Sequence, residues 1–220
     1  MANVLIIGGN RGIGNALVNG YLARGETVWA SCRQDSGFLD TDSCTLIPGV
    51  DMTTEDGALA LAEALRDVRI DLAVINAGIL KHSGWPEVNL ETVAHQLMVN
   101  AVGPLRMAKA LVPRMVAGGK LGILTSRMGS LTDNTSGGYY GYRMSKAAVN
   151  AMGVSLARDL QPAGIAVALL HPGFVQTDMT GGRGEVTADF AAKGLMERMD
   201  ALSLENSGTF WHAQGQALPW

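Results

Sequence analysis

Short apolar runs alternate with longer amphipathic stretches along the whole chain. The apolar runs place Val, Ile and Leu on consecutive positions, which is typical of strands buried on both faces of a parallel sheet. Strands are predicted for residues 3–8, 27–31, 71–78, 120–126 and 164–173, with a short one near Leu46 and a last one at 208–213.

The amphipathic stretches between these runs predict helices. Helices are expected at residues 13–25, 54–68, 90–116, 140–160 and 188–202. Thr54 is a candidate N-cap for the second helix, because its hydroxyl can accept a hydrogen bond from a free amide of the first turn. Pro104 and Pro113 must bend or interrupt the third helix, and Pro162 ends the fourth.

The repeated order of strand and helix indicates an α/β fold. We expect a doubly wound Rossmann-type fold with about seven parallel strands and helices on both faces of the sheet. No linker, low-complexity tract or internal repeat divides the sequence, so residues 1–220 are expected to form a single domain. Residues 177–202 begin with a stretch rich in glycine, threonine and charge, for which we expect a surface excursion before the last helix.

Composition excludes several classes of function. The 220 residues carry a formal net charge of −3 and no cluster of Lys and Arg, so neither nucleic acid nor a membrane surface is an expected partner. No apolar run approaches the ~18 residues of a membrane helix, and no signal peptide is expected at the N-terminus. Only Cys32 and Cys44 are present, which favours a reducing, cytoplasmic location over a disulfide framework. The histidines lack metal-ligand spacing, and no Gly-x-Ser-x-Gly elbow indicates a hydrolase.

A glycine-rich loop follows the first predicted strand and opens the first predicted helix. Its glycines are Gly8, Gly12 and Gly14, a spacing that differs from the Gly-x-Gly-x-x-Gly fingerprint because Leu17 occupies the last small position. A loop without side chains lets backbone amides approach a pyrophosphate, and the helix N-terminus adds a partial positive charge. The loop alone is also compatible with a tight turn that only packs the helix on the strand.

Tyr142 and Lys146 are four residues apart on a predicted helix, which places their Cβ atoms ~5–6 Å apart on one face. A nearby ammonium lowers the pKa of a phenol from its usual value of about 10, so this tyrosine is expected to exchange protons near neutral pH. Tyr139 has Arg143 at the same spacing, and Tyr140 has only Met144. A solvated helix face could also carry a tyrosine and a lysine, so the pair alone does not decide.

The order of the motifs along the chain decides between these interpretations. The sequence contains, in order, Gly8-x-x-x-Gly12-x-Gly14, Asn76-Ala77-Gly78, Asn100, Ser126, Tyr142-x-x-x-Lys146 and Pro172-Gly173. With these motifs the chain resembles the short-chain dehydrogenase/reductase family over nearly its full length. Details such as "NRGIG" and "GYRMSKAA" are similar to the branch that includes C-factor and Sniffer-type carbonyl reductases.

The resemblance implies a role for each catalytic candidate. Tyr142 would donate the proton in carbonyl reduction, and Lys146 would lower its pKa and bind the nicotinamide ribose. Asn100 would hold a water that links Lys146 to solvent. Ser126 would bind the substrate oxygen. Ser130 is the rival of Ser126, which we prefer because it ends a strand at the edge that faces the ligand crevice.

The resemblance also implies a set of cofactor contacts. Tyr142 and Lys146 belong to it together with Gly8, Asn10, Arg11, Gly12, Ile13, Gly14, Arg33, Asp51, Asn76, Ala77, Gly78, Pro172, Gly173, Val175 and Thr177. Ile7 departs from the threonine that is usual in the family.

The predicted cofactor is NADP(H), with NAD(H) as the alternative. Arg33 follows the second strand, where arginine accommodates the 2′-phosphate of NADP, and Arg11 could add a second charge. Asp35 could turn inward and repel this phosphate.

The sequence leaves the function with more than one hypothesis. The first is an NADP(H)-dependent oxidoreductase that reduces an aldehyde or ketone, or oxidises the alcohol. The alternative is a cofactor-binding signalling or regulatory protein of the C-factor type with little or no turnover. A sugar-nucleotide epimerase or dehydratase shares the Tyr-Lys pair, but it carries a larger C-terminal substrate domain.

The expected partners are a small-molecule substrate and further copies of the chain in a homodimer or homotetramer. Tyr139 and Tyr140 could line the pocket, lie in a subunit contact or only pack.

Overall fold

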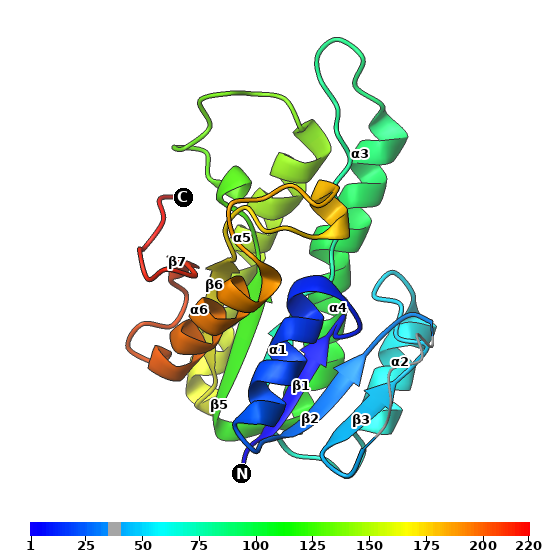
Figure 1. Ribbon diagram of the computed structural model, residues 1–220, viewed down its shortest axis with the longest axis vertical. Helices are drawn as coiled ribbons and strands as arrows, with labels where there is room; N and C mark the ends of the chain where they lie inside the picture. Colours follow the sequence, from blue (N-terminus) through cyan, green and yellow to red (C-terminus); the bar gives the residue numbers. More distant parts are fainter. Residues whose placement is uncertain (35–40) are drawn as a thin grey trace.

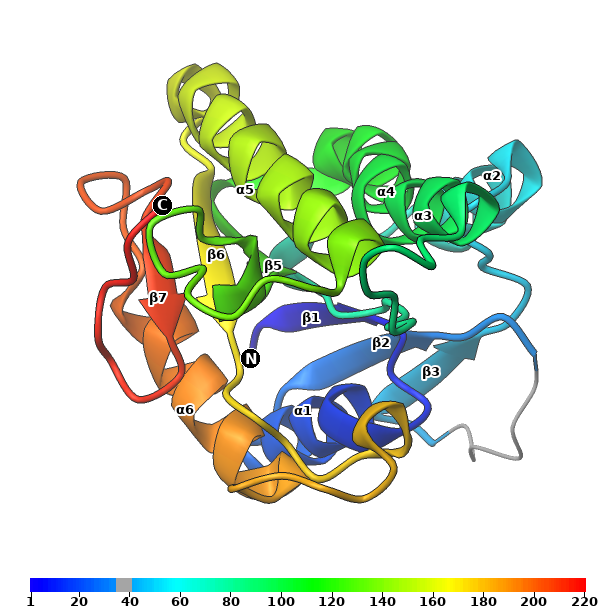
Figure 2. The same cartoon turned by 90° about the horizontal axis from the view of Figure 1, so that it is seen from above.

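The computed structural model describes residues 1–34 and 41–220 and has three layers, with one parallel sheet between two layers of helices (Figures 1 and 2). The seven strands lie in the order β3-β2-β1-β4-β5-β6-β7, and all neighbouring strands in this order are parallel. The expected doubly wound Rossmann-type fold is confirmed.

The strands are β1 (Asn3–Ile7), β2 (Thr27–Ser31), β3 (Cys44–Ile47), β4 (Ile70–Ile75), β5 (Met115–Leu124), β6 (Ala166–His171) and β7 (Phe210–His212). The α-helices are α1 (Gly12–Ala23), α2 (Glu55–Ala64), α3 (Leu90–Leu97), α4 (Gly103–Leu111), α5 (Tyr140–Leu160) and α6 (Ala188–Ala201). Figure 2 shows α2, α3, α4 and α5 on one face of the sheet and α1 and α6 on the other.

The continuous apolar runs are explained by two separate cores, one on each face. Within β1, Leu5 and Ile7 belong to the core beneath α2, α4 and α5, whereas Val4 and Ile6 belong to the core beneath α1 and α6. Successive side chains of a strand point to opposite faces, so a strand covered on both sides must be apolar at every position.

The third predicted helix is interrupted, as its prolines indicated, but its expected end at residue 116 is wrong. Residues 90–97 form α3, a π-helical segment follows at Met98–Val102, and α4 begins at Gly103. Pro104 lies in the first turn of α4, where a missing amide donor costs least. After a 3₁₀ turn at Val112–Arg114 that contains Pro113, Met115 already begins β5.

The caps of two helices are relevant to the site. The Thr54 hydroxyl accepts a hydrogen bond from the amide of Gly57 at 3.0 Å, so the predicted N-cap of α2 is confirmed. The N-terminus of α1 has no side-chain cap at Arg11, so its first amides remain available to a ligand. Within the described ranges, no helix is long and apolar enough to cross a bilayer.

Candidate active site

The predicted site residues lie at the carboxyl edge of the sheet. The strand order reverses between β1 and β4, because β1 is followed by β2 on one side while β4 continues the sheet on the other. Such a switch point opens a crevice between neighbouring loops and is where open α/β sheets bind their ligands. The glycine loop leaves β1 here, and residues Asn76, Ala77 and Gly78 leave β4 beside it.

The glycine loop is packed too closely for side chains. A Cβ on Gly14 would lie 2.0 Å from the carbonyl oxygen of Gly8, and a Cβ on Gly8 would lie 2.9 Å from Ala77 Cβ. Asn76 Nδ2 donates to the same Gly8 oxygen at 2.9 Å, which ties the loop to the end of β4. The result is a cradle lined by backbone at the N-terminus of α1, which suits a pyrophosphate.

The segment after β6 closes over the glycine loop. A Cβ on Gly12 would lie 3.4 Å from Thr177 Cγ2, so the two predicted cofactor segments are adjacent. Arg11 Nη1 lies 3.5 Å from a carboxylate oxygen of Asp178, and both side chains are largely exposed. Because exposed ion pairs are weak, this pair leaves Arg11 able to turn toward another anion.

Tyr142 lies at the inner end of the site, where its side chain is 8% exposed and is hydrogen-bonded to Ser126. Burial raises the pKa of the phenol, and the hydrogen bond with Ser126 lowers it by less. The predicted lowering of this pKa is therefore wrong for the protein without bound ligands. Burial removes the water that would stabilise a phenolate, and this effect prevails.

Lys146 lies one helical turn beyond Tyr142 and is also buried, with 5% exposure. Its Nζ donates to the carbonyl oxygen of Leu124 at 3.0 Å and lies 5.8 Å from the centre of the Tyr142 ring. Burial lowers the pKa of this amine to about 8. An ammonium has three donors, so further donors can reach a sugar hydroxyl.

Asn100 lies in the π-helical segment and connects three parts of the site. Its Nδ2 donates to the carbonyl oxygen of Ile79 at 2.8 Å and to Ser145 Oγ at 3.0 Å, and its Oδ1 accepts from the amide of Ile79 at 2.8 Å. Ser145 Oγ in turn donates to the carbonyl oxygen of Tyr142. A Cβ on Gly78 would lie 3.2 Å from Asn100 Oδ1 and 3.7 Å from Lys146 Nζ. The loop after β4, the π-helical segment and α5 are thereby held together.

The two serine candidates have different environments. Ser126 lines the cavity, contacts Tyr142, and accepts a hydrogen bond from the amide of Met128 at 3.2 Å. Ser130 is buried and accepts from the amide of Asp133 at 3.1 Å, a contact that caps a turn. The geometry favours Ser126 as the serine that faces a ligand.

A cavity of about 510 Å³ contains the open side of this site. It is lined by Ile13, Leu80, Thr125, Ser126, Arg127, Met128, Asp133, Ser136, Tyr139, Tyr142, Arg143, His171, Pro172, Gly173, Phe174, Val175, Thr177, Met179 and Thr180. Tyr139 thus lies in the cavity wall, with its ring edge-on to His82, whereas Tyr140 is more exposed. No sequence motif indicated Arg127, Met128, Arg143 or Met179 for the site, although Arg143 directly follows Tyr142.

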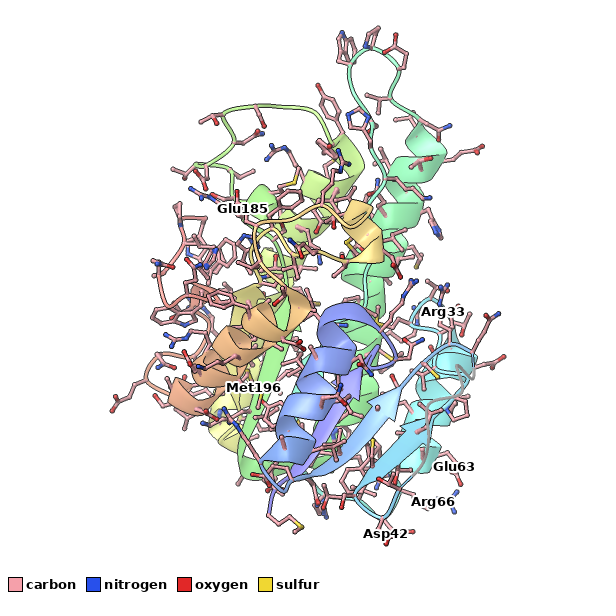
Figure 3. All side chains as sticks on the ribbon, in the orientation of Figure 1. Arg33, Asp42, Glu63, Arg66, Glu185 and Met196 are labelled. Carbon is pink, nitrogen blue, oxygen red and sulfur yellow. The ribbon has the colours of Figure 1, made fainter. Side chains whose placement is uncertain are left out.

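The remaining cofactor candidates lie at the other end of the edge. Asn10 follows β1 in the glycine loop, and Arg33 is exposed just beyond β2, as Figure 3 shows. Asp51 lies between β3 and α2, where hydrogen bonds from the hydroxyl and the amide of Thr53 lower its pKa. Asp35 lies outside the described residues.

The chain is similar to several known proteins. Residues 2–187 match the family model described as short chain dehydrogenase. The 1-hydroxy-2-glutathionyl-2-methyl-3-butene dehydrogenase of Rhodococcus sp. (strain AD45) is 40% identical over 226 residues, with all of both chains covered. The C-signal protein of Myxococcus xanthus is 42% identical over 157 residues, which cover 69% of this chain and 93% of that protein.

Solved structures show the same relationship. The carbonyl reductase Sniffer of D. melanogaster superposes with a TM-score of 0.91 at 28% identity, with all of both chains covered. An NADPH-bound carbonyl reductase from chicken fatty liver gives a TM-score of 0.89 at 27% identity, and covers 100% of this chain and 99% of its own. The resemblance inferred from the motifs is confirmed, and the chain belongs to the short-chain dehydrogenase/reductase family.

Proposed function

We propose that the protein is an NADP(H)-dependent reductase of aldehydes or ketones. The observation that supports this most is the buried Tyr142, hydrogen-bonded to Ser126 and one turn from Lys146, in the wall of a cavity that also reaches Ile13 and Thr177 beside the glycine loop. An acid, an oxygen-binding hydroxyl and a cradle for a dinucleotide thus share one space.

The residues present fit a nicotinamide dinucleotide. The backbone cradle between Gly8 and Gly14 would hold the pyrophosphate on the N-terminus of α1, and Lys146 Nζ would hold the nicotinamide ribose. Pro172, Gly173, Val175 and Thr177 line the cavity where the nicotinamide would lie. The remaining predicted contacts, Asn10, Arg11, Gly12, Ile13, Asp51, Asn76, Ala77 and Gly78, are proposed for the rest of the dinucleotide. A bound cofactor would supply the hydride, with its two electrons, that reduces the carbonyl carbon.

The side chains complete the reduction. Ser126 Oγ donates a hydrogen bond to the substrate oxygen, on which negative charge develops as the C=O π bond breaks. The Tyr142 hydroxyl gives its proton to this oxygen, so the product is the neutral alcohol. Lys146 lies near enough to stabilise the phenolate that forms, and Asn100 fixes the backbone beside Lys146.

The raised pKa of Tyr142 favours the reductive direction. Below this pKa the phenol holds its proton and is ready to donate it, whereas alcohol oxidation needs the phenolate at the start. At neutral pH the ligand-free site therefore contains the species that carbonyl reduction requires.

The test is a panel of aldehydes and ketones with NADPH, with Tyr142→Phe as the matched variant. We expect Tyr142→Phe to lower kcat/KM by at least about 100-fold, because it removes the proton donor and keeps the ring. Nucleotide binding, measured by fluorescence titration, should stay within about threefold of the unaltered protein. Tight nucleotide binding without turnover of any panel member would contradict the proposal and favour the signalling hypothesis.

Arg33 is proposed to select NADP(H). It is an exposed cation just after β2, where a 2′-phosphate would lie. We expect a lower KM for NADPH than for NADH, and Arg33→Gln should reduce this preference by roughly tenfold. Arg66→Gln removes an arginine of a surface ion pair with Glu63 and serves as the control. A preference for NADH in the unaltered protein would refute the assignment.

Two wider features belong to the same proposal. We propose that residues 1–220 act as one domain in which residues 177–202 form much of the substrate pocket, since Thr177, Met179 and Thr180 line the cavity. We also propose a homodimer or homotetramer, because α3, α4 and α5 share one face of the sheet and α4 and α5 expose Leu105 and Met144. Light scattering coupled to size exclusion tests this, and a monomer at micromolar concentration would contradict it.

A further inference from the structure

We infer that the substrate carries an anionic group, such as a carboxylate, which binds to the Arg143 guanidinium in the large cavity. This inference rests on the proposed reductase function and adds a substrate class to it. Two observations support it: Arg143 lies in the cavity wall, and its hydrogen-bond acceptors are all neutral.

Arg143 lines the cavity that holds Tyr142 and Ser126, and it lies on the same helix as Tyr142. The two residues are consecutive in the first turn of α5, and both line the same cavity as Ser126. A substrate whose oxygen lies at Ser126 and Tyr142 therefore shares one cavity with this guanidinium.

Arg143 forms no ion pair within the described ranges of the chain, and its charge is only a minor cause, after the hydrogen bond from Arg127, of the lowered pKa of Asp133. Its Nη2 donates to Ser136 Oγ at 2.9 Å, while Nε donates to Gly137 O at 3.3 Å and Nη1 to Met128 O at 3.4 Å. All three acceptors are neutral, and two of the bonds are long. Among the described residues, no carboxylate lies within 4.0 Å of it. A half-buried guanidinium with five donors is thus held in place but not neutralised.

The other ionisable groups of the cavity do not cancel the positive charge of Arg143. Arg127 and Asp133 form an ion pair with each other, so they add little net charge. His171 is neutral at pH 7, because burial lowers its pKa to about 3. Arg143 therefore provides the uncompensated positive charge among the residues that line the cavity.

The cavity of about 510 Å³ has walls from separate parts of the chain. Thr177 contacts the glycine loop, whereas Arg143 contacts the segment from Met128 to Gly137, so the two belong to different walls. Leu80, Phe174 and Met179 line the same cavity and provide apolar surface. This combination fits a molecule with an apolar body, a carbonyl or hydroxyl group and a carboxylate.

The experiment compares charged and neutral forms of the same compound. 4-Carboxybenzaldehyde and 3-carboxybenzaldehyde are each compared with their methyl esters for kcat/KM with NADPH. The corresponding carboxybenzyl alcohols and their esters are titrated into the NADPH complex, where no hydride transfer can occur, so that binding is measured apart from turnover. We expect the acid to be preferred by roughly 10- to 100-fold in at least one pair, which is the contribution of a hydrogen bond to a charged group.

The variants assign this preference to one side chain. Arg143→Gln should remove it for both kcat/KM and binding, Arg143→Lys should retain part of it, and Arg66→Gln should leave it unchanged. A structural role alone would lower the values for acid and ester equally and leave their ratio intact. Equal values for acid and ester in the unaltered protein, or a ratio that survives Arg143→Gln, would overturn the inference. Charge-dependent binding of the alcohols without turnover of any aldehyde would instead contradict the proposed reductase and leave the inference standing.

Discussion

Tyr142 shows how burial changes the chemistry of a residue that sequence spacing alone suggests is acidic. The spacing to Lys146 predicts a stabilised phenolate, and the ring does lie near the amine. However, both groups are buried, so the pKa of the phenol is raised and that of the amine is lowered to about 8. Burial penalises each charged form, and this leaves a protonated acid that is suited to reduction.

His171 gives a pH dependence of stability whose sign follows from its burial. Burial, with the His212, Arg127 and Lys146 charges, lowers its pKa to about 3, whereas the unfolded chain titrates near 6.5. Between these values the unfolded state binds more protons, so the free energy of unfolding falls as pH falls, by up to about 1.4 kcal/mol per pH unit.

We therefore expect His171→Asn to flatten this dependence. Urea unfolding at pH 6.5, 5.5 and 4.5 measures it, with the slope of the unfolding free energy against pH as the readout. An unchanged slope in His171→Asn would mean that other groups are responsible.

Gly14 is the glycine of the cradle that tolerates a side chain least. A Cβ there would lie 2.0 Å from a backbone oxygen that cannot move without opening the contact between β1 and α1. We expect Gly14→Ala to weaken NADPH binding at least tenfold and to destabilise the fold. Gly84→Ala is the matched control, since its Cβ would meet no atom within 4 Å. Fluorescence titration and thermal melts of both variants provide the test, and equal behaviour would contradict it.

At the scale of elements, local sequence determined where α2 starts. The α2 helix starts at Glu55 because Thr54 caps it, and no tertiary contact is needed for this bond. The end of the α4 region, in contrast, was decided by a tertiary contact. Met115 pairs with Ile70 of β4, so a residue that fits a helical pattern was recruited into the sheet.

The contribution of the Thr54 cap to the free energy of unfolding can be measured. Thr54→Ala leaves the amide of Gly57 without this acceptor, so we expect a loss of ~1 kcal/mol in the free energy of unfolding. Thr54→Ser keeps the hydroxyl and should recover most of that loss. Urea denaturation at pH 7 distinguishes the two, and the same stability for both variants would show that the cap contributes nothing.

At the scale of the whole molecule, the proposed dinucleotide site extends across both halves of the sheet. The proposed contacts come from the loops after β1, β2, β3, β4, β5 and β6, and they lie along one edge. A ligand that contacts all of them should stabilise the folded state, and at 100 times its Kd this effect is about 2.7 kcal/mol.

For a chain of this size such an effect raises Tm by roughly 5–10 °C. We expect this rise with saturating NADPH, and a smaller one with the same concentration of NADH. Differential scanning fluorimetry measures both, and Arg33→Gln should bring the two rises closer together. A larger rise with NADH would contradict the proposed role of Arg33.

The sequence by itself determined the layered fold and the order of the motifs. Residues such as Val4, Leu5, Ile6 and Ile7 are apolar without interruption because each face of the strand meets its own core, and this pattern is local enough to be recognised. The pairing of Tyr142 with Lys146 was also predictable, since helical geometry places residues four apart on one face.

Only the tertiary structure decided which side chains share the cavity and which forms they take. Arg143 of α5 meets Met128 there, and Met128 lies in a short turn without a periodic pattern, so spacing along the chain could not bring them together. The pKa values of Tyr142, Lys146 and His171 depend on how much water the packed chain excludes. Burial of a polar group results from the packing of distant segments, and for that reason local sequence does not reveal it.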